Sequence, residues 1–276
     1  MTQTRRTEPA VRAGAPPHLP ATAAAAEPSV RLDQVSLCYR LAKQRIPSLK
    51  EYAIHWLKGA LTYEKLWALS EVSFAAAPGE RIGVVGRNGA GKSTLLKVIS
   101  GVLQPTRGRA VTRGRVAPIL ELGTGFDTEL TGLENVYLYA LLLGRSRREI
   151  AERAEAIVAF SGLGDFIRSP IRNYSTGMLA RLGFSIATAW TPDVLILDEV
   201  LGVGDASFRR RCAERIASFE RTTLFLVSHN EEDILASCDR CLWLEAGRLR
   251  MDGDPREVLA AYAQVMGGRA RAPAER

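Results

Sequence analysis

The sequence predicts an α/β protein whose largely parallel β-sheet is covered by helices on both faces. Three observations lead to this class. Short apolar runs alternate with helical patterns towards the end of the chain, a glycine-rich loop joins one apolar run to a helix, and a block of helical periodicity separates these two regions. Strands that alternate with helices form a parallel sheet, because each helix returns the chain to the edge where the next strand begins. The separating block is then a helical subdomain inserted into the sheet.

The expected elements follow from hydrophobic periodicity, with short apolar runs read as strands and apolar residues at i, i+3 and i+4 read as helices. The expected strands are Val30–Val35, Ala68–Phe74, Arg81–Val85, Val194–Leu197, Thr223–Val227 and Cys241–Leu244. The expected helices are Gly91–Gly101, Gly132–Leu143, Arg147–Phe160, one that follows Asn173–Met178 and runs to about Trp190, Phe208–Phe219, Glu231–Ala236 and Pro255–Val265. The helical subdomain is expected at about residues 127–185.

The ends of the chain differ from the rest in composition. Residues 1–28 are mostly Ala, Pro, Thr and Arg, so apolar burial there does not offset the entropy of ordering. We therefore expect a disordered leader over residues 1–28, one α/β domain over 29–266 and a flexible tail over 267–276. About ten residues follow the last expected helix, which leaves no room for a β-sandwich.

An additional amphipathic helix is predicted at Leu49–Leu61. Ser48 and Glu51 form a capping-box pattern, and an apolar stripe at helical spacing follows them. From Arg40 to Lys65 there are six Lys and Arg against two Asp and Glu, a local charge of +4. Two interpretations stay open: the helix packs on the protein's own core, or it faces a membrane surface or a membrane partner.

Composition narrows the function classes. Apolar residues make up 46% and charged residues 24%, which excludes collagen-like, coiled-coil and wholly disordered chains. The net charge of +7 favours anionic partners, namely nucleotides, nucleic acid or an anionic membrane surface. No apolar run is long enough to span a bilayer, so we expect a protein of the cytosol or of the cytosolic side of a membrane. The cysteines, which include the pair Cys238 and Cys241, are expected to be buried thiols rather than half of a zinc site.

A phosphate-binding loop follows the strand Arg81–Val85. Its pattern is G-x-x-x-x-G-K-[ST], and glycines there let several backbone N–H groups and a helix N-terminus point at one anion. The lysine reaches the β- and γ-phosphates of a nucleotide, and the serine hydroxyl is a magnesium ligand. The loop residues are Gly86, Arg87, Asn88, Gly89, Ala90, Gly91, Lys92, Ser93 and Thr94.

Further candidate residues follow expected strands or begin a helix. Asp198 and Glu199 end the buried strand Val194–Leu197, where one acid can hold magnesium and the other can act as general base towards water. His229 follows the strand Thr223–Val227 and can reach the γ-phosphate at the carboxyl edge of the sheet. Ser175 and Gly177 form a small-residue turn at a helix N-terminus, which is a weak anion-site signal.

Together these motifs resemble the ATP-binding-cassette (ABC) nucleotide-binding domain, a P-loop NTPase fold with an inserted helical subdomain. The resemblance covers about residues 29–262, with Walker A at Gly86–Thr94, a signature motif at Tyr174–Met178, Walker B at Val194–Glu199, a D-loop around Gly204-Asp205 and the switch histidine His229. Two departures stand out. The signature reads Tyr-Ser-Thr-Gly-Met, and Glu121 occupies the place of the usual Q-loop glutamine, where it would take part in magnesium sensing.

These departures are similar to those of the polysaccharide and polyol-phosphate exporter ATPases, which serve O-antigen, capsule and teichoic-acid export. Residues Val116–Phe126 and Asp198–Ala206 carry this likeness, together with the segment around Leu49–Leu61. In such proteins an aromatic side chain ahead of Walker A stacks on adenine. Tyr39 is the better match, and Trp67 is a rival.

The resemblance implies an ATPase that binds ATP and Mg²⁺, with hydrolysis coupled to export of a lipid-linked polysaccharide. Two copies would enclose two ATP molecules, with Ser175 and Gly177 of one copy against the nucleotide of the other. The partners would be an ABC-2-type membrane permease and, through it, the lipid-linked glycan, with the chain peripheral on the cytoplasmic face of the inner membrane. Three rival interpretations stay open: an exporter ATPase for a lipid or drug, an ATP-binding regulator, and a nucleic-acid ATPase. We expect no nucleic-acid partner, because aromatic and basic residues do not cluster in the sequence.

Overall fold

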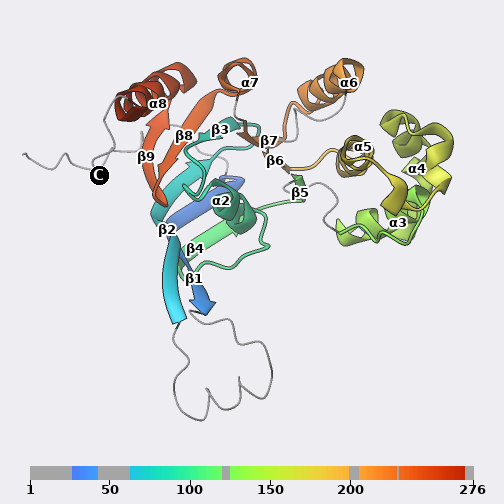
Figure 1. Cartoon of the computed structure of the whole chain (residues 1–276), viewed down its shortest axis with the longest axis horizontal. Helices are drawn as coiled ribbons and strands as arrows, with labels where there is room; N and C mark the ends of the chain where they lie inside the picture. Colours follow the sequence, from blue (N-terminus) through green and yellow to red (C-terminus); the bar gives the residue numbers. More distant parts are fainter. Residues whose placement is uncertain (1–26, 43–62, 120–124, 199–204, 229, 271–276) are drawn as a thin grey trace, which may run out of the picture.

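A computed structural model describes residues 27–42, 63–119, 125–198, 205–228 and 230–270 (Figure 1). Its larger sheet has the strand order β5-β6-β7-β3-β8-β9. Neighbouring strands are parallel except for the hairpin β8–β9, which is antiparallel. The strands are β3 (Arg81–Val85), β5 (Val116–Ile119), β6 (Val194–Asp198), β7 (Thr223–Val227), β8 (Arg240–Glu245) and β9 (Arg248–Gly253). The expectation of a largely parallel sheet is confirmed.

Both faces of this sheet are buried, because alternate residues of its strands enter two different cores. In β6, Val194 and Ile196 pack with α2 (Lys92–Ile99) and the smaller sheet. Leu195 and Leu197 pack on the other face with apolar side chains of four helices. These helices are α5 (Thr176–Ala187), α6 (Ala206–Ala217), α7 (Glu231–Ser237) and α8 (Pro255–Ala270). Strands covered on both faces read as continuous apolar runs, which is why they were recognisable in the sequence.

A smaller antiparallel sheet, of order β2-β1-β4, was not predicted. It consists of β1 (Val30–Ala42), β2 (Tyr63–Ala76) and β4 (Arg107–Thr112). β1 and β2 pair from Val30↔Ala76 to Ala42↔Tyr63, so both are longer than the expected strands. The register shifts along this pair, and such bulges break the alternation by which a strand is recognised.

The inserted helical block lies between β5 and β6 in the chain and to one side of the sheets (Figure 1). It holds α3 (Gly132–Leu142), α4 (Arg147–Ser161), the 3₁₀ turns η1 (Gly164–Arg168) and η2 (Ile171–Asn173), and α5. Capping boxes begin α3 and α4: Thr131 pairs with Glu134 and Ser146 with Glu149. A separate core, which includes Val136, Ile157 and Leu182, holds the block together.

Several boundaries differ from expectation. Strands β4, β5 and β9 were missed, because β4 and β9 are polar, half-exposed strands and β5 has only four residues, one of them Pro118. The helix after the signature motif ends at Ala187 rather than near Trp190. Helix α8 continues to Ala270, four residues into the expected tail. The leader up to residue 26 and the amphipathic helix Leu49–Leu61 fall outside the described residues.

The cysteine side chains in the structure are mostly buried, as the sequence led us to expect. Cys212, Cys238 and Cys241 are buried, whereas Cys38 is half-buried. Burial in apolar surroundings raises the pKa of each buried thiol to about 12, which keeps it protonated and unreactive at neutral pH. Within the described ranges, none of the helices combines the length and the apolar character that a bilayer crossing requires.

Arg240 joins the two sheets. Its guanidinium binds both carboxylate oxygens of Asp252 on β9, at 2.5 and 2.6 Å, and also donates to the Ala75 carbonyl oxygen on β2 at 2.9 Å. A further bond of 2.9 Å reaches the Glu80 carboxylate. One cation therefore separates two carboxylates and holds the β8–β9 hairpin against the smaller sheet.

We predict that Arg240→Met lowers the free energy of unfolding by about 2 kcal/mol, because it leaves Asp252 and Glu80 facing each other without a cation. Urea unfolding followed by circular dichroism measures this. Arg148→Met is the control, since Arg148 and its partner Glu152 are both exposed on α4; it should leave the urea midpoint unchanged. Equal urea midpoints for the two variants would show that the contacts of Arg240 with Asp252 and Glu80 do not stabilise the fold.

Candidate nucleotide-binding site

The loop from Gly86 to Gly91 connects β3 to α2 at the carboxyl edge of the parallel strands. Two of its glycines leave no room for a side chain. At Gly86 (φ 151°) a Cβ would lie 2.3 Å from the Leu244 carbonyl oxygen, and at Gly91 (φ 104°) it would lie 2.5 Å from the Ala68 carbonyl oxygen. The loop is therefore packed directly against the backbones of β8 and β2, which fixes its shape.

Lys92, the first residue of α2, is 8% exposed and folded into the loop. Its Nζ donates to the Gly86 carbonyl oxygen at 2.7 Å and to the Arg87 carbonyl oxygen at 3.2 Å. Gly91 provides no side-chain cap for α2, so the positive end of the helix dipole and the ammonium group lie at the same place and favour an anion there. Ser93 is exposed at the same helix end. These features form a phosphate cradle.

A cavity of about 410 Å³ adjoins this cradle. Its lining combines loop and α2 residues with side chains from the paired ends of β1 and β2: Tyr39, Leu66, Trp67, Ala68, Asn88, Gly89, Gly91, Lys92, Ser93 and Thr94. A volume of this size suits a small ligand such as a nucleotide. Of the expected binding residues, Gly86, Arg87 and Ala90 belong to the same loop without lining this cavity.

Tyr39 and Trp67 differ in their surroundings. Tyr39 packs against the core that contains α2, and its hydroxyl is 3.5 Å from Thr94 Oγ1. Trp67 is 39% exposed, and its ring carries the guanidinium of Arg107 at 5.2 Å, a cation–π contact. Tyr39 is thus directed towards the phosphate cradle, whereas the face of Trp67 is already occupied by β4.

The strand ends next to the loop carry the other expected residues. Asp198 is the last residue of β6 and pairs in register with Val227 of β7, which is itself next to β3. After β7, Ser228 Oγ accepts from the Asn230 N–H at 3.0 Å and donates to Asp233 at 2.8 Å. The structure thus brings Asp198 and Ser228 to the edge that holds the cradle. Glu121, Glu199 and His229 fall outside the described residues.

The structure keeps the signature segment apart from the cavity. Ser175 is the N-cap of α5, where its Oγ accepts from the Met178 N–H at 3.2 Å, and Gly177 lies in the first turn. Behind them the buried Tyr174 donates from its hydroxyl to the Phe166 carbonyl oxygen at 2.6 Å, which anchors the turn to the helical block. Neither Ser175 nor Gly177 lines the cavity beside the loop.

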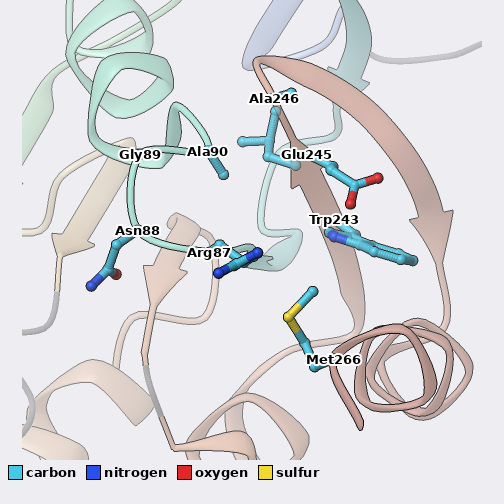
Figure 2. A pocket seen from close by; sticks show the side chains of 9 residues that line it. Arg87, Asn88, Gly89, Ala90, Trp243, Glu245, Ala246 and Met266 are labelled. Carbon is cyan, nitrogen blue, oxygen red and sulfur yellow. The ribbon is translucent and has the colours of Figure 1, made fainter. Parts of the chain in front are cut away.

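A second hollow, which no sequence motif indicated, lies on the other side of the loop (Figure 2). It has a volume of about 270 Å³ between the loop, the β8–β9 turn and α8. Arg87 points into it, across from Trp243 and Met266 (Figure 2). Trp243 is held by Arg250, whose guanidinium lies 4.8 Å from the ring, and by an edge contact with Tyr262. Met266 lies in α8 one residue beyond the expected end of the last helix, Val265, so the sequence did not place it at this hollow.

The fold and the cradle define a nucleotide-binding protein of the P-loop class. A family model described as ABC transporter matches residues 69–202. The O-antigen export system ATP-binding protein RfbB of Klebsiella pneumoniae is 46% identical over 244 residues, which are 87% of this chain and 99% of that protein. The teichoic acids export ATP-binding protein TagH of Staphylococcus haemolyticus is 38% identical over 240 residues, 86% of this chain and 89% of that protein.

Solved structures agree on the fold. The post-hydrolysis dimer of the ATP-binding cassette MJ0796 bound to ADP and Pi aligns with a TM-score of 0.65 at 20% identity, over 82% of this chain and 99% of that chain. An ATP-binding subunit of an ABC transporter aligns with a TM-score of 0.66 at 22% identity, over 85% and 93%. The chain belongs to the ABC transporter family, as an ATP-binding subunit that hydrolyses ATP. The expected fold and family are confirmed.

We predict that Gly91→Ala weakens ATP binding at least about tenfold, or ~1.4 kcal/mol, because the new methyl group displaces the loop from β2. Isothermal titration calorimetry with ATP and Mg²⁺ measures the affinity. Gly101→Ala is the matched control: Gly101 follows α2 outside the cavity and also has a positive φ, of 77°, but a Cβ there meets no described atom within 4 Å. If both variants lose affinity equally, the close approach to Ala68 is not what shapes the cradle.

Proposed function

We propose that the chain powers the export of a lipid-linked polysaccharide, of O-antigen, capsule or teichoic-acid type, across the cytoplasmic membrane. The observation that carries this proposal is the 46% identity to an O-antigen export ATP-binding protein over 99% of that protein. A likeness over the whole length includes surfaces that contact partners, besides the phosphate loop that other ATPases share. An ABC-2-type permease would form the channel, and this chain would bind to it at the cytoplasmic face of the inner membrane.

ATP would bind with its phosphates in the cradle. Lys92 already lies within the loop, where its ammonium group can exchange two carbonyl oxygens for phosphate oxygens. Ser93 Oγ and the Asp198 carboxylate are oxygen donors, the ligand type that Mg²⁺ prefers, at the N-terminus of α2 and at the carboxyl end of β6, two strands away from β3 in the sheet. Bound magnesium would offset charge on the phosphates. Tyr39 would stack on the adenine, because it faces Thr94, whereas Trp67 already holds the guanidinium of Arg107 against its ring.

Hydrolysis would require groups at the ends of β6 and β7. Glu199, one residue after Asp198, would accept a proton from the attacking water. His229, between Ser228 and Asn230, would contact the γ-phosphate. Glu121 would stand between the cradle and the helical block, in the place of the Q-loop glutamine. The protein's contribution is then mainly positioning and charge stabilisation, as is usual for phosphoryl transfer.

The separation of the signature segment from the cradle supports a dimer. Ser175 and Gly177 do not line the cavity of their own chain. Among the atoms of the described residues, a Cβ at Gly177 would meet only Ser175 Oγ, at 3.8 Å, so the turn offers open backbone to an incoming anion. In a two-fold dimer each copy would present this turn to the ATP held by the other, and two sites would be completed at once.

The transport role is tested by purifying the tagged chain from native membranes in mild detergent. We expect a multi-spanning subunit to co-purify, with a lipid-linked glycan detected by mass spectrometry. Cells that carry Lys92→Ala in place of the native chain should accumulate the same glycan on the cytoplasmic side. Co-purification with nucleic acid, or with a membrane subunit that carries no glycan, would refute the export of polysaccharide.

We predict that Glu199→Gln binds ATP normally, hydrolyses it at least about a hundredfold more slowly and accumulates as an ATP-bound dimer, because glutamine keeps the shape of the side chain but is no base. Phosphate release assays and size-exclusion chromatography in ATP and Mg²⁺ measure both effects. Lys92→Ala is the contrast, since it should weaken binding itself. Near-normal turnover of Glu199→Gln would remove this residue from catalysis.

A further prediction distinguishes the two aromatic candidates. Tyr39→Ala should raise the Kd for ATP about tenfold, because the adenine loses a stacking surface worth ~1–2 kcal/mol. Trp67→Ala should change it less than about twofold, since its ring binds Arg107 instead. Calorimetry with ATP measures both variants. The reverse order of effects would show that Trp67 is the adenine platform.

A further inference from the structure

Arginine side chains gather where α4 of the helical block meets α6. The guanidinium of Arg215 lies 4.2 Å from the centre of the Phe160 ring, near the end of α4, and that of Arg211 lies 5.6 Å from it. Arg211 also donates to the Phe160 carbonyl oxygen at 3.1 Å. Two cations of α6 therefore cover one aromatic side chain of α4.

A cavity of about 50 Å³ lies beside this contact, and we call it the α4–α6 cavity. Its lining is apolar except for two guanidinium groups and one hydroxyl: Arg153, Ala156, Ile157, Phe160, Ser185, Ala189 and Arg215. The Ser185 hydroxyl donates to the Arg181 carbonyl oxygen at 2.5 Å. The side-chain donors left to the cavity are therefore those of Arg153 on α4 and Arg215 on α6.

No carboxylate balances these two cations in the part of the chain that the structure describes. The acids next to them in the sequence belong to other ion pairs: Glu152 with Arg148, and Glu214 with Arg210. Burial, followed by the charge of Arg153, lowers the pKa of Arg215 from its ordinary value. The two guanidinium groups are thus close enough to repel each other, and an anion between them would offset that repulsion.

Arg215 is already positioned for a ligand. Its Nη1 donates to the Thr188 carbonyl oxygen at 2.9 Å, and its planar group rests on the Phe160 ring. Among the described residues this is its one hydrogen bond, so other N–H groups of the guanidinium can bind an anion. A side chain held in this way loses little conformational freedom on binding. Arg153 is exposed on α4 and can contact the same anion from the other side.

We propose that the α4–α6 cavity is a binding site for a single phosphate group, held between Arg153 and Arg215. The charge determines the class of ligand: a phosphate group carries about −1.5 to −2 charges at neutral pH and offers oxygens to both guanidinium groups, whereas a carboxylate balances only one. The volume determines its size, because about 50 Å³ accepts one such group and excludes a nucleotide. Bound phosphate ties α4 of the helical block to α6.

This site is separate from the phosphate cradle, since none of the described residues lines both cavities. Its ligand is either free inorganic phosphate or the phosphate headgroup of an anionic lipid, which present the same group to the two arginines. The inference does not depend on the transport role proposed above.

Isothermal titration calorimetry with inorganic phosphate tests the site in the full chain carrying Lys92→Ala, which removes the ammonium group of the cradle. In this background Arg153→Ala should weaken phosphate binding at least about tenfold, because the anion loses one of its two partners. Arg215→Gln should have the same effect. Arg148→Ala is the matched control: Arg148 is exposed on the same helix but pairs with Glu152, so its loss should leave the affinity unchanged. Because Arg153 is also exposed, Arg153→Ala keeps the test decisive if Arg215→Gln does not fold.

Thermal unfolding provides a second readout. Phosphate at about ten times its Kd should raise the Tm of the Lys92→Ala chain by about 3 °C, because the ligand binds only the folded state. Sodium chloride of equal ionic strength should not raise it. Arg153→Ala should abolish the shift, and Arg148→Ala should keep it.

Vesicle flotation distinguishes the two sources of phosphate. If a lipid headgroup is the ligand, the Lys92→Ala chain should float with phosphatidic acid vesicles but not with phosphatidylcholine vesicles, Arg153→Ala should lose this binding, and inorganic phosphate should give no heat. Binding that survives in Arg153→Ala, or a rise in Tm that sodium chloride reproduces, would overturn the proposal. So would the absence of binding to both inorganic phosphate and phosphatidic acid.

Discussion

The close approach of three backbones around the glycine loop is the constraint on which the rest of the structure depends. Gly86 lies against the Leu244 carbonyl of β8, and Gly91 lies against the Ala68 carbonyl of β2. The Gly247 N–H in the β8–β9 turn donates to the Ala90 carbonyl at 3.0 Å, and the Gly247 carbonyl accepts from the Ser70 N–H at 2.8 Å. The two sheets meet at this point, so the phosphate cradle is formed only when both sheets are in place. Arg240 holds the same junction from the far end of β8.

The sheets and the helical block have different roles in the proposed site. The sheets, α2 and the strand ends carry the proposed contacts to the phosphates of the chain's own nucleotide. The helical block has its own core and presents Ser175 away from that cradle. In the proposed dimer each copy would be incomplete on its own, and hydrolysis would be conditional on assembly. The hollow on the outer side of the loop, with Arg87, Trp243 and Met266, shows that the loop also has a second exposed face.

The sequence predicted the parallel sheet and the cradle because both depend on local patterns. Doubly buried strands such as Thr223–Val227 are continuous apolar runs, and the loop motif has fixed spacing. It did not predict β4 or β9, whose pairing depends on neighbours distant in the chain, nor the bulged extensions of β1 and β2. The resemblance favoured Tyr39 over Trp67, but the contact of Arg107 with Trp67 could not be predicted, since only the pairing of β1, β2 and β4 places the two side chains together.

The central claim is that Ser175 of one copy completes the site around Lys92 of the other. Mixing two inactive variants, Lys92→Ala and Ser175→Arg, tests it most directly by ATPase turnover. In a mixed dimer with shared sites, one site combines both changes and the other is intact. The mixture should then recover up to about a quarter of wild-type turnover, because half of the dimers are mixed and each has one intact site. A mixture no more active than its two parents would contradict the account.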